Sequence, residues 1–176
     1  MVRQAHHRVA MVVAFRDFRD VEYFIPRDVL QGAGAEIVNI SSQKGIAIGA
    51  DGGEVEIDLV PAEFKAEDFD AVVFMGGPGM AKRLDDEDFQ RIAKETVRAN
   101  KVLGAICIAP ALLAKAGVLK GKKATVWSGP LERSPIRILE EGGAIYQDED
   151  VVIDGKVVTA KGPTAAKEFA EAVIQA

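Results

Sequence analysis

Residues 101–117, KVLGAICIAPALLAKAG, are almost free of charge and hold the only cysteine of the chain, Cys107. Residues 102–106 are apolar enough for a central strand of a sheet. Pro110 is incompatible with such a strand but suits the first turn of a helix. The chain must therefore turn between them, which predicts that Cys107 lies at a sharp strand-to-helix corner. Such a corner lies at the carboxyl end of the sheet, where open α/β folds bind ligands.

Outward from this corner, short runs rich in Val and Ile alternate with amphipathic stretches. This alternation is typical of an α/β fold with a doubly wound, mostly parallel sheet sandwiched by helices. The expected strands are 8–14, 36–41, one within 70–79 that runs into a glycine turn, 102–106 and 123–127, with small β-hairpins at Asp51-Gly52-Gly53 and Asp154-Gly155. The expected helices are 21–31, 85–100, one over 130–143 that is interrupted or restarted at Pro135, and 163–176.

Length and charge limit the organisation and the partners. The chain has 176 residues, 48% of them hydrophobic, which suits one core. We expect a single domain over 8–176 and an N-terminal extension over 1–7. Acidic residues outnumber basic ones 27 to 22, the net charge is -5, and no run of Lys or Arg stands out, which argues against nucleic acid as a partner.

Other classes of protein are excluded by what the sequence lacks. The longest charge-free stretch, 102–114, falls short of the roughly 18 residues that a membrane span needs. No apolar signal core precedes the first expected strand, and a lone cysteine cannot form an internal disulfide, so we expect a cytoplasmic protein. Two histidines, His6 and His7, and one thiol make no convincing metal site, and we expect neither metal nor cofactor.

Cys107 is the first candidate for chemistry. A helix N-terminus stabilises negative charge and can lower a thiol pKa from about 8.5 to between roughly 3.5 and 7.5. The corner thus predicts a reactive thiolate. The alternative is an inert thiol that fills the core, because free cysteine is among the most buried residue types.

Four segments carry a resemblance to a known family: AICIAPALLAKAGVLKGKKATV, DVEYFIPRDVLQGAGAEIVNIS, DFDAVVFMGGPG and DGKVVTAKGPTAAKEFA. Together they resemble the DJ-1/PfpI superfamily of reactive-cysteine proteins over nearly the whole chain. The resemblance implies a flavodoxin-like sandwich, usually homodimeric, whose elbow cysteine faces a protonated carboxyl from the first helix. Glu22 matches that carboxyl, and proton sharing would relieve the conflict between two neighbouring acids. The alternative for Glu22 is an exposed acid near a helix N-terminus.

The resemblance also implies backbone donors for an oxyanion. Gly76 and Gly77 follow a buried strand, and the amides of Gly77 and Ile108 match the family's oxyanion hole. A purely structural turn is the alternative, because Gly-Gly-Pro-Gly is a strong turn signal. Trp127 and Ser128 stand where many glyoxalase and deglycase members have a histidine. Trp127 and Ser128 are possible pocket walls, and the alternative for Trp127 is a core-packing indole.

These residues favour a protein that acts on small reactive aldehydes in the manner of a glyoxalase or deglycase, that responds to oxidative stress through its thiol, or both. Its expected partners are a small aldehyde or peroxide and further copies of itself, as a homodimer or higher homo-oligomer. A PfpI-like cysteine peptidase is an alternative that Ile108 weakens, since peptidase-like relatives have histidine there. A redox-sensing, chaperone-like dimer is another. A dinucleotide site is a poor match, because Lys82 stands where the third glycine of the fingerprint belongs.

Overall fold

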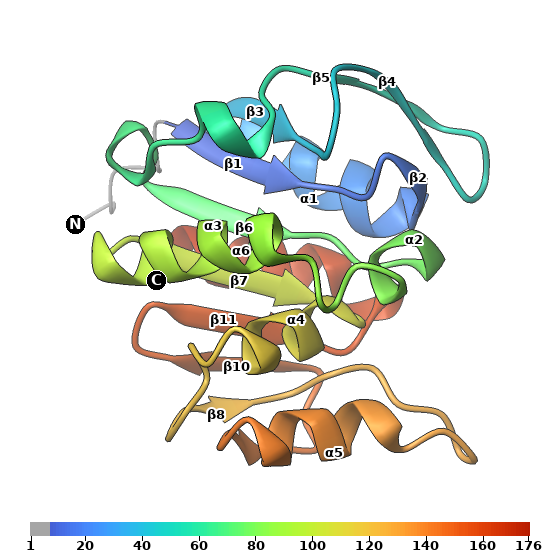
Figure 1. The fold of residues 1–176 in the computed structure, drawn as a ribbon, viewed down its shortest axis with the longest axis vertical. Coiled ribbons are helices and arrows are strands. Elements are labelled where there is room, and N and C mark those ends of the chain that lie inside the picture. Colours follow the sequence, from blue (N-terminus) through green and yellow to red (C-terminus); the bar gives the residue numbers. More distant parts are fainter. Residues whose placement is uncertain (1–7) are drawn as a thin grey trace.

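The computed structural model describes residues 8–176 and contains a central sheet of six strands (Figure 1). Five of these strands run parallel, and β10 joins the edge antiparallel to β11. The order across the sheet is β10 (Val151–Asp154), β11 (Val157–Ala160), β7 (Val102–Ile106), β6 (Ala71–Phe74), β1 (Arg8–Val12) and β3 (Glu36–Ile40). The predicted doubly wound, mostly parallel sheet is therefore confirmed.

Helices cover both faces of this sheet because alternate residues of each strand point to opposite sides. In β1, Ala10 and Val12 enter one core cluster, and Val9 and Met11 enter the other. One face carries α3 (Glu87–Arg98), α4 (Ala109–Lys115) and α5 (Ser134–Glu141), and the other carries α1 (Asp20–Gly32) and α6 (Ala166–Gln175).

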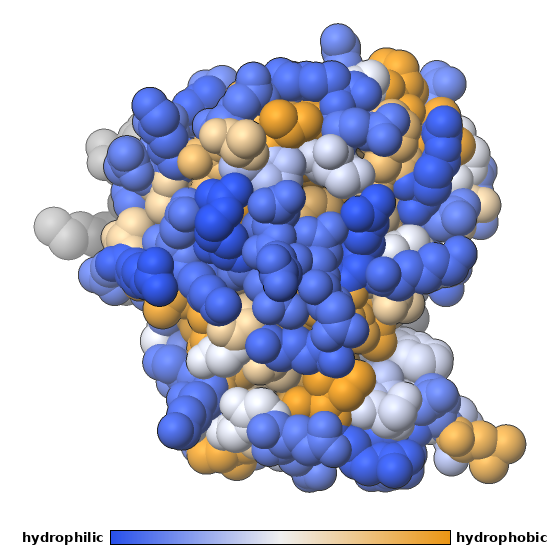
Figure 2. All heavy atoms as spheres, viewed as in Figure 1, coloured by the Kyte–Doolittle hydropathy of each residue, from blue (hydrophilic) through white to orange (hydrophobic). Residues whose placement is uncertain are grey.

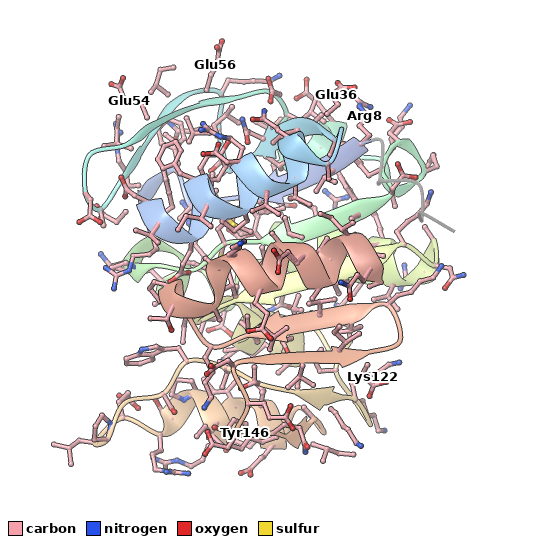
Figure 3. The ribbon with its side chains drawn as sticks, turned by 180° about the vertical axis from the view of Figure 1, so that it is seen from behind. Arg8, Glu36, Glu54, Glu56, Lys122 and Tyr146 are labelled. Atoms are coloured by element: carbon pink, nitrogen blue, oxygen red, sulfur yellow. The ribbon has the colours of Figure 1, made fainter. Side chains whose placement is uncertain are left out.

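The outer surfaces of these helix layers are polar. Figure 2 shows the face over α3 as mostly hydrophilic, which fits the many charged residues of that helix. Seen from behind, α1 and α6 lie side by side across the sheet (Figure 3). The labelled pair Arg8 and Glu36 forms an ion pair of 3.4 Å between neighbouring strands, while Glu54 and Glu56 project outward from the hairpin.

Two smaller sheets lie beside the main one. The predicted hairpin at 51–53 is confirmed as β4 (Gly45–Gly49) and β5 (Glu54–Ile57), and it pairs with β2 (Arg16–Phe18) in a three-stranded sheet. The sequence did not predict β2, because its three residues, RDF, show no alternation. The hairpin at Asp154-Gly155 is also confirmed, with Gly155 in the left-handed region at φ +61°.

The strand expected at 123–127 is only partly right. Strand β8 (Lys123–Ala124) pairs with β9 (Ile145–Tyr146) and then stops. The N–H of Thr125 donates to the hydroxyl of Thr159 at 3.0 Å, and the N–H of Trp127 donates to the carbonyl of Cys107 at 2.8 Å. Because these two N–H groups bond to Thr159 and Cys107, they are not available to pair with β9, and the strand ends at Ala124.

The expected helix around Pro135 starts late. Helix α5 begins at Ser134, whose N–H donates to the carboxylate of Glu132 at 2.8 Å, and Pro135 lies in its first turn. The remaining short elements are α2 (Pro78–Ala81) and three 3₁₀ turns: η1 (Pro61–Glu63), η2 (Ala66–Asp68) and η3 (Pro163–Ala165). The expected extension at 1–7 lies outside the described residues. Within 8–176, no helix has the length and apolar character needed to cross a membrane.

Candidate active site

Cys107 lies at the corner between β7 and α4, as the sequence predicted. Its backbone is in the left-handed region at φ +63°, which costs a non-glycine residue roughly 1 kcal/mol or more. Two hydrogen bonds hold it there. The Cys107 N–H donates to the carbonyl of Ala160 at 2.9 Å, and the Cys107 carbonyl accepts from the N–H of Trp127 at 2.8 Å. The sulfur is therefore fixed by backbone contacts to two other segments.

Glu22 lies in the first turn of α1 and is fully buried. The start of this helix is anchored on two sides. The N–H of Arg19 donates to the carbonyl of Gly76 at 3.0 Å. The carboxylate of Asp20 accepts from the N–H groups of Asp51 and Gly53 at 3.0 and 2.7 Å, which ties the helix to the β4–β5 turn. These bonds fix the first turn of α1, and with it the position of the buried Glu22.

The carboxyl of Glu22 and the side chain of Cys107 meet at Gly76. A Cβ added at Gly76 would overlap the Glu22 carboxyl and lie 2.5 Å from the Cβ of Cys107. Only glycine leaves room for both groups. Among residues 8–176, neither carboxyl oxygen of Glu22 has a hydrogen-bond partner that meets the usual distance and angle limits. The thiol of Cys107 and the N–H of Gly76 lie near enough to stabilise the charged carboxylate.

Burial raises the pKa of Glu22 to about 7, because a desolvated carboxylate is costly. The Cys107 thiol, the charge of Arg19 and the Gly76 amide each favour the charged form, but together they oppose the shift only in part. At neutral pH the carboxyl is therefore roughly half protonated. This value suits a group that both accepts and returns a proton.

The thiol departs from the sequence expectation. Burial and, next, the Glu22 carboxyl raise the pKa of Cys107 to about 12, whereas a lowered pKa was predicted from the helix N-terminus. The N–H groups of Ile108 and Gly77 do favour the thiolate, but less than desolvation opposes it. The two acids titrate as a pair, and a thiolate forms here when the thiol proton moves to Glu22.

A cavity of about 240 Å³ opens onto the sulfur. Its lining is mostly apolar or small: Arg19, Gly77, Pro78, Ala81, Cys107, Ile108 and Trp127. Trp127 is 39% exposed and lines the cavity, so it is not the core-packing indole that was the alternative. Ser128 is not among the lining residues. Gly76 is fully enclosed and faces Glu22, which leaves the amides of Gly77 and Ile108 as the donors beside the sulfur.

Sequence reasoning missed Arg19. Arg19 directly precedes α1 and has extended backbone, φ −79° and ψ 110°, so helical spacing does not place it beside the pair. Its place in the lining depends on the close contact between its backbone and Gly77, which the sequence does not show. Within the described part of the chain, no group of three or more His, Cys, Asp or Glu side chains could hold a metal ion. His6 and His7 lie outside it.

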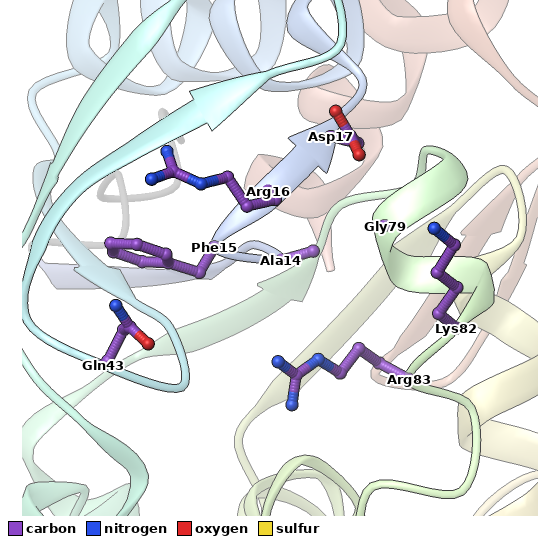
Figure 4. A pocket seen from close by; sticks show the side chains of 8 residues that line it. All are labelled: Ala14, Phe15, Arg16, Asp17, Gln43, Gly79, Lys82 and Arg83. Atoms are coloured by element: carbon purple, nitrogen blue, oxygen red, sulfur yellow. The ribbon is translucent and has the colours of Figure 1, made fainter.

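A larger cavity of about 410 Å³ opens on the other side of α2 (Figure 4). Gln43 and Arg83 lie on facing sides of its opening, and the guanidinium of Arg16 lies 5.1 Å from the ring of Phe15. The lining comprises Ala14, Phe15, Arg16, Asp17, Gln43, Gly79, Lys82 and Arg83. It includes neither Cys107 nor Glu22, so the larger cavity has charged groups but lacks the thiol and the buried carboxyl.

Comparison with known proteins gives a consistent result. Residues 7–176 match the model of the DJ-1/PfpI family. The uncharacterized protein MJ0967 of Methanocaldococcus jannaschii is 39% identical, covering 96% of this chain and 82% of that protein. Deglycase PfpI of Pyrococcus furiosus is 31% identical, covering 87% of this chain and 89% of that protein. The crystal structure of a ThiJ/PfpI domain protein from Brachyspira murdochii superimposes with a TM-score of 0.91 at 34% identity, covering 96% and 94% of the two chains.

Relatives of similar identity carry different names. One is the glutathione-independent glyoxalase DJR-1.2 of Caenorhabditis elegans, 28% identical over 90% of this chain and 82% of that protein. Another is the putative cysteine protease YraA of Bacillus subtilis, 33% identical over 92% and 93%. Similarity of sequence therefore assigns the family and leaves the reaction to the chemistry of the site.

Proposed function

This chain belongs to the DJ-1/PfpI family, and on that premise we propose that it is a cysteine-dependent enzyme acting on small reactive aldehydes. Cys107 is the nucleophile and Glu22 carries the proton. The observation that supports this most is the meeting of thiol and carboxyl at Gly76, beside a small apolar cavity. About 240 Å³ admits a molecule of a few heavy atoms.

The first step with a 2-oxoaldehyde is addition to the aldehyde carbon. The sulfur of Cys107 forms a bond to that carbon, the π electrons move to oxygen, and the thiol proton passes through Glu22 to that oxygen. The product is a hemithioacetal. The N–H groups of Gly77 and Ile108 lie beside the sulfur and stabilise the developing negative charge on oxygen.

The second step needs a base that can also act as an acid. Ionised Glu22 removes the proton from the carbon bonded to sulfur, which leaves an enediolate, and returns a proton to the neighbouring carbon. The hydroxyl proton on the first carbon moves to the oxygen of the neighbouring carbon, so that the first carbon becomes a carbonyl and the hemithioacetal becomes a 2-hydroxy thioester. Water then cleaves the thioester to a 2-hydroxy acid and free thiol. No net oxidation occurs, so no cofactor is required. A Glu22 pKa of about 7 keeps both protonation states populated near neutral pH.

Methylglyoxal turnover to lactate tests this proposal. We expect turnover by the wild type and a loss of about a thousandfold or more in Cys107→Ala and in Glu22→Gln. Glu67→Gln is the matched control, since Glu67 is an exposed acid in η2, before β6 begins. Equal turnover in wild type, Cys107→Ala and Glu22→Gln would exclude the aldehyde route.

A peptidase is less well supported. The residue after the nucleophile is Ile108, and the cavity is small for a peptide backbone with side chains. Protonation of an amine leaving group then depends on Glu22 alone. We expect casein hydrolysis by the purified protein to be absent or very slow, and Cys107→Ala to leave any residual rate unchanged.

An oxidation-responsive thiol is the second candidate function, either beside the enzymatic role or in a chaperone-like dimer. Cys107 is only partly buried, and the N–H groups of Gly77 and Ile108 lie where they would bind oxygen atoms added to sulfur. Treatment with peroxide should add oxygen to Cys107 in the wild type and leave position 107 unmodified in Cys107→Ala. Peptide mapping must separate this from methionine oxidation. Homodimer formation and a cytoplasmic location remain predictions.

A further inference from the structure

The proposed chemistry does not use the side chain of Arg19, which lines the smaller cavity beside Cys107. It is the only charged residue in the lining apart from the titrating thiol, since the other members are Gly77, Pro78, Ala81, Ile108 and Trp127. Within 8–176, neither an ion pair nor a side-chain hydrogen bond occupies its guanidinium. A cation without a partner lies at the wall of an apolar cavity.

Several other cations of the molecule have carboxylate partners. Arg83 pairs with Asp86 at 3.0 Å, Arg91 with Glu95 at 3.1 Å, and Lys115 with Asp85 at 2.9 Å, to give three examples. These pairs satisfy surface charge locally. The charge of Arg19 instead acts on the reactive pair, because it favours the ionised form of Glu22.

The backbone at Arg19 is well fixed. Its N–H donates to the carbonyl of Gly76 at 3.0 Å, and its carbonyl accepts from the N–H of Tyr23 at 3.1 Å. A Cβ added at Gly77 would overlap the backbone nitrogen of Arg19, so the two segments are in close contact. The side chain therefore starts from a fixed point beside Gly77, and it lines the same cavity as Cys107.

These contacts point to the class of substrate. We propose that Arg19 makes the cavity selective for small aldehydes that carry a carboxylate one or two bonds from the carbonyl carbon. A guanidinium offers a planar pair of donors that matches a carboxylate, and Arg19 is exposed at the cavity with no partner for these donors among the described residues. The inference rests on the proposed role of Cys107 as nucleophile.

Binding of such an aldehyde is a simple addition. The sulfur of Cys107 bonds to the aldehyde carbon, the carbonyl π electrons move to oxygen, and the thiol proton moves to that oxygen, while the carboxylate of the ligand contacts Arg19. The 2-hydroxy acid that the proposed reaction releases carries the same group. If Arg19 binds this group, the product also contacts it, and we expect 2-hydroxy acids to inhibit the enzyme.

Two alkylating reagents test the charge selectivity without requiring turnover. Iodoacetate and iodoacetamide present the same carbon and the same leaving iodide, and each forms a C–S bond as the C–I bond breaks and the thiol loses its proton to solvent. They differ in charge. The ratio of their rates at Cys107 cancels any change in the intrinsic reactivity of the thiol, including a change that passes through Glu22.

We expect the iodoacetate-to-iodoacetamide ratio to fall about fivefold in Arg19→Gln at pH 8 and low salt. Arg16→Gln is the matched control, because Arg16 is a nearby exposed cation that lines the other cavity. Its ratio should stay within about twofold of the wild type. An unchanged ratio in Arg19→Gln, or an equal fall in both variants, overturns the proposal. Circular dichroism confirms that the variants are folded.

Protection by aldehydes tests the ligand class directly. Glyoxylate should slow alkylation of the wild type by iodoacetamide at a concentration about fivefold lower than acetaldehyde does, and Arg19→Gln should abolish the difference. Equal protection by the two aldehydes in the wild type rejects the carboxylate selectivity. If methylglyoxal is not turned over and the glyoxylate preference is nevertheless seen, the enzymatic proposal fails while the selectivity of the cavity stands.

Discussion

Two cavities open at the carboxyl ends of the parallel strands, one on each side of α2, and they differ in what they offer a ligand. The smaller, about 240 Å³, has a thiol, a buried carboxyl nearby and one exposed cation, Arg19. The larger, about 410 Å³, has Arg16, Lys82 and Arg83 with one acid, Asp17. The larger one lies where the strand order reverses between β1 and β6, the usual ligand site of open α/β sheets. Volume and position thus favour the larger cavity as a ligand site, whereas the thiol and the buried carboxyl favour the smaller one.

Desolvation accounts for the contrast. Glu22 is fully buried and its pKa is raised to about 7, whereas Asp17, at the larger cavity, is exposed to water. A buried acid can exchange protons near neutral pH, and an exposed cation can attract an anion but cannot transfer a proton to it at that pH. The smaller cavity is suited to catalysis because the neighbouring acid, Glu22, is buried and its pKa is therefore close to neutral.

The contrast between the buried and the exposed acid predicts a difference in how the free energy of unfolding depends on pH. Because the folded pKa of Glu22 is about 7 and the unfolded value about 4.5, the folded state holds the proton more tightly between these values. Stability contributed by this group is therefore present below about pH 4.5 and is lost as pH rises through about 7, with an upper limit of about 3 kcal/mol. Glu22→Gln should remove this loss and make the protein more stable than wild type at pH 8.

Denaturant unfolding at several pH values between 5 and 8 measures this difference. Asp17→Asn is the control, since it removes an exposed acid from the other cavity and asparagine tolerates the left-handed backbone at that position, φ +60°. A wild-type curve and a Glu22→Gln curve with the same pH slope would show that Glu22 is hydrated, and the contrast between the cavities would disappear.

A second prediction compares Gly76, at the thiol and carboxyl beside the smaller cavity, with Gly79, which lines the larger one. A Cβ at Gly76 overlaps the Glu22 carboxyl, and a Cβ at Gly79 overlaps the carbonyl oxygen of Arg16. Both Gly76→Ala and Gly79→Ala should destabilise the protein by about 1–3 kcal/mol. Only Gly76→Ala separates thiol from carboxyl, so we expect it to lower methylglyoxal turnover about a hundredfold and Gly79→Ala to lower it less than about tenfold.

Thermal unfolding and turnover, measured on the same samples, separate these outcomes. Gly32→Ala is the reference, because a Cβ at Gly32 meets no atom within 4 Å. Equal losses of turnover in Gly76→Ala and Gly79→Ala would mean that the wall between the cavities, and not the contact at Gly76, controls the reaction.

The smallest expected effect concerns the larger cavity itself. Lys82→Gln should change methylglyoxal turnover by less than about twofold, because Lys82 is exposed and lines only the cavity without the nucleophile. Steady-state rates at low and physiological salt measure this. A loss of more than about tenfold would show that the two cavities act as one site.

The sequence predicted the parts of the fold that depend on local patterns. Pro110 and the apolar run before it placed Cys107 at a corner, and the glycine turn after β6 placed Gly77 nearby. Strand β2 and the early end of β8 were not predictable, because both depend on tertiary contacts, such as the bond from Thr125 to the hydroxyl of Thr159. Local pattern does not show which donors the neighbouring segment will occupy.

In the candidate site, too, the features that depend on tertiary contacts could not be predicted from the sequence pattern. Glu22 was placed by family resemblance, and its meeting with Cys107 at Gly76 is a property of the folded chain. The thiol pKa was predicted in the wrong direction, since a helix N-terminus is visible in sequence and the burial of the thiol and of Glu22 is not. Arg19 was missed because its significance lies in having no partner, which only the three-dimensional surroundings reveal.

The hydrogen bonds at the corner also bear on how the protein assembles. The N–H of Cys107 donates to the carbonyl of Ala160 at the end of β11, and its carbonyl accepts from the N–H of Trp127. The sulfur therefore acquires its final surroundings only after Trp127, about 20 residues later in the chain, and Ala160, about 50 residues later, have docked. The lone thiol is therefore a built-in reporter of folding. Its accessibility to a thiol reagent during refolding marks the moment at which β11 joins the sheet.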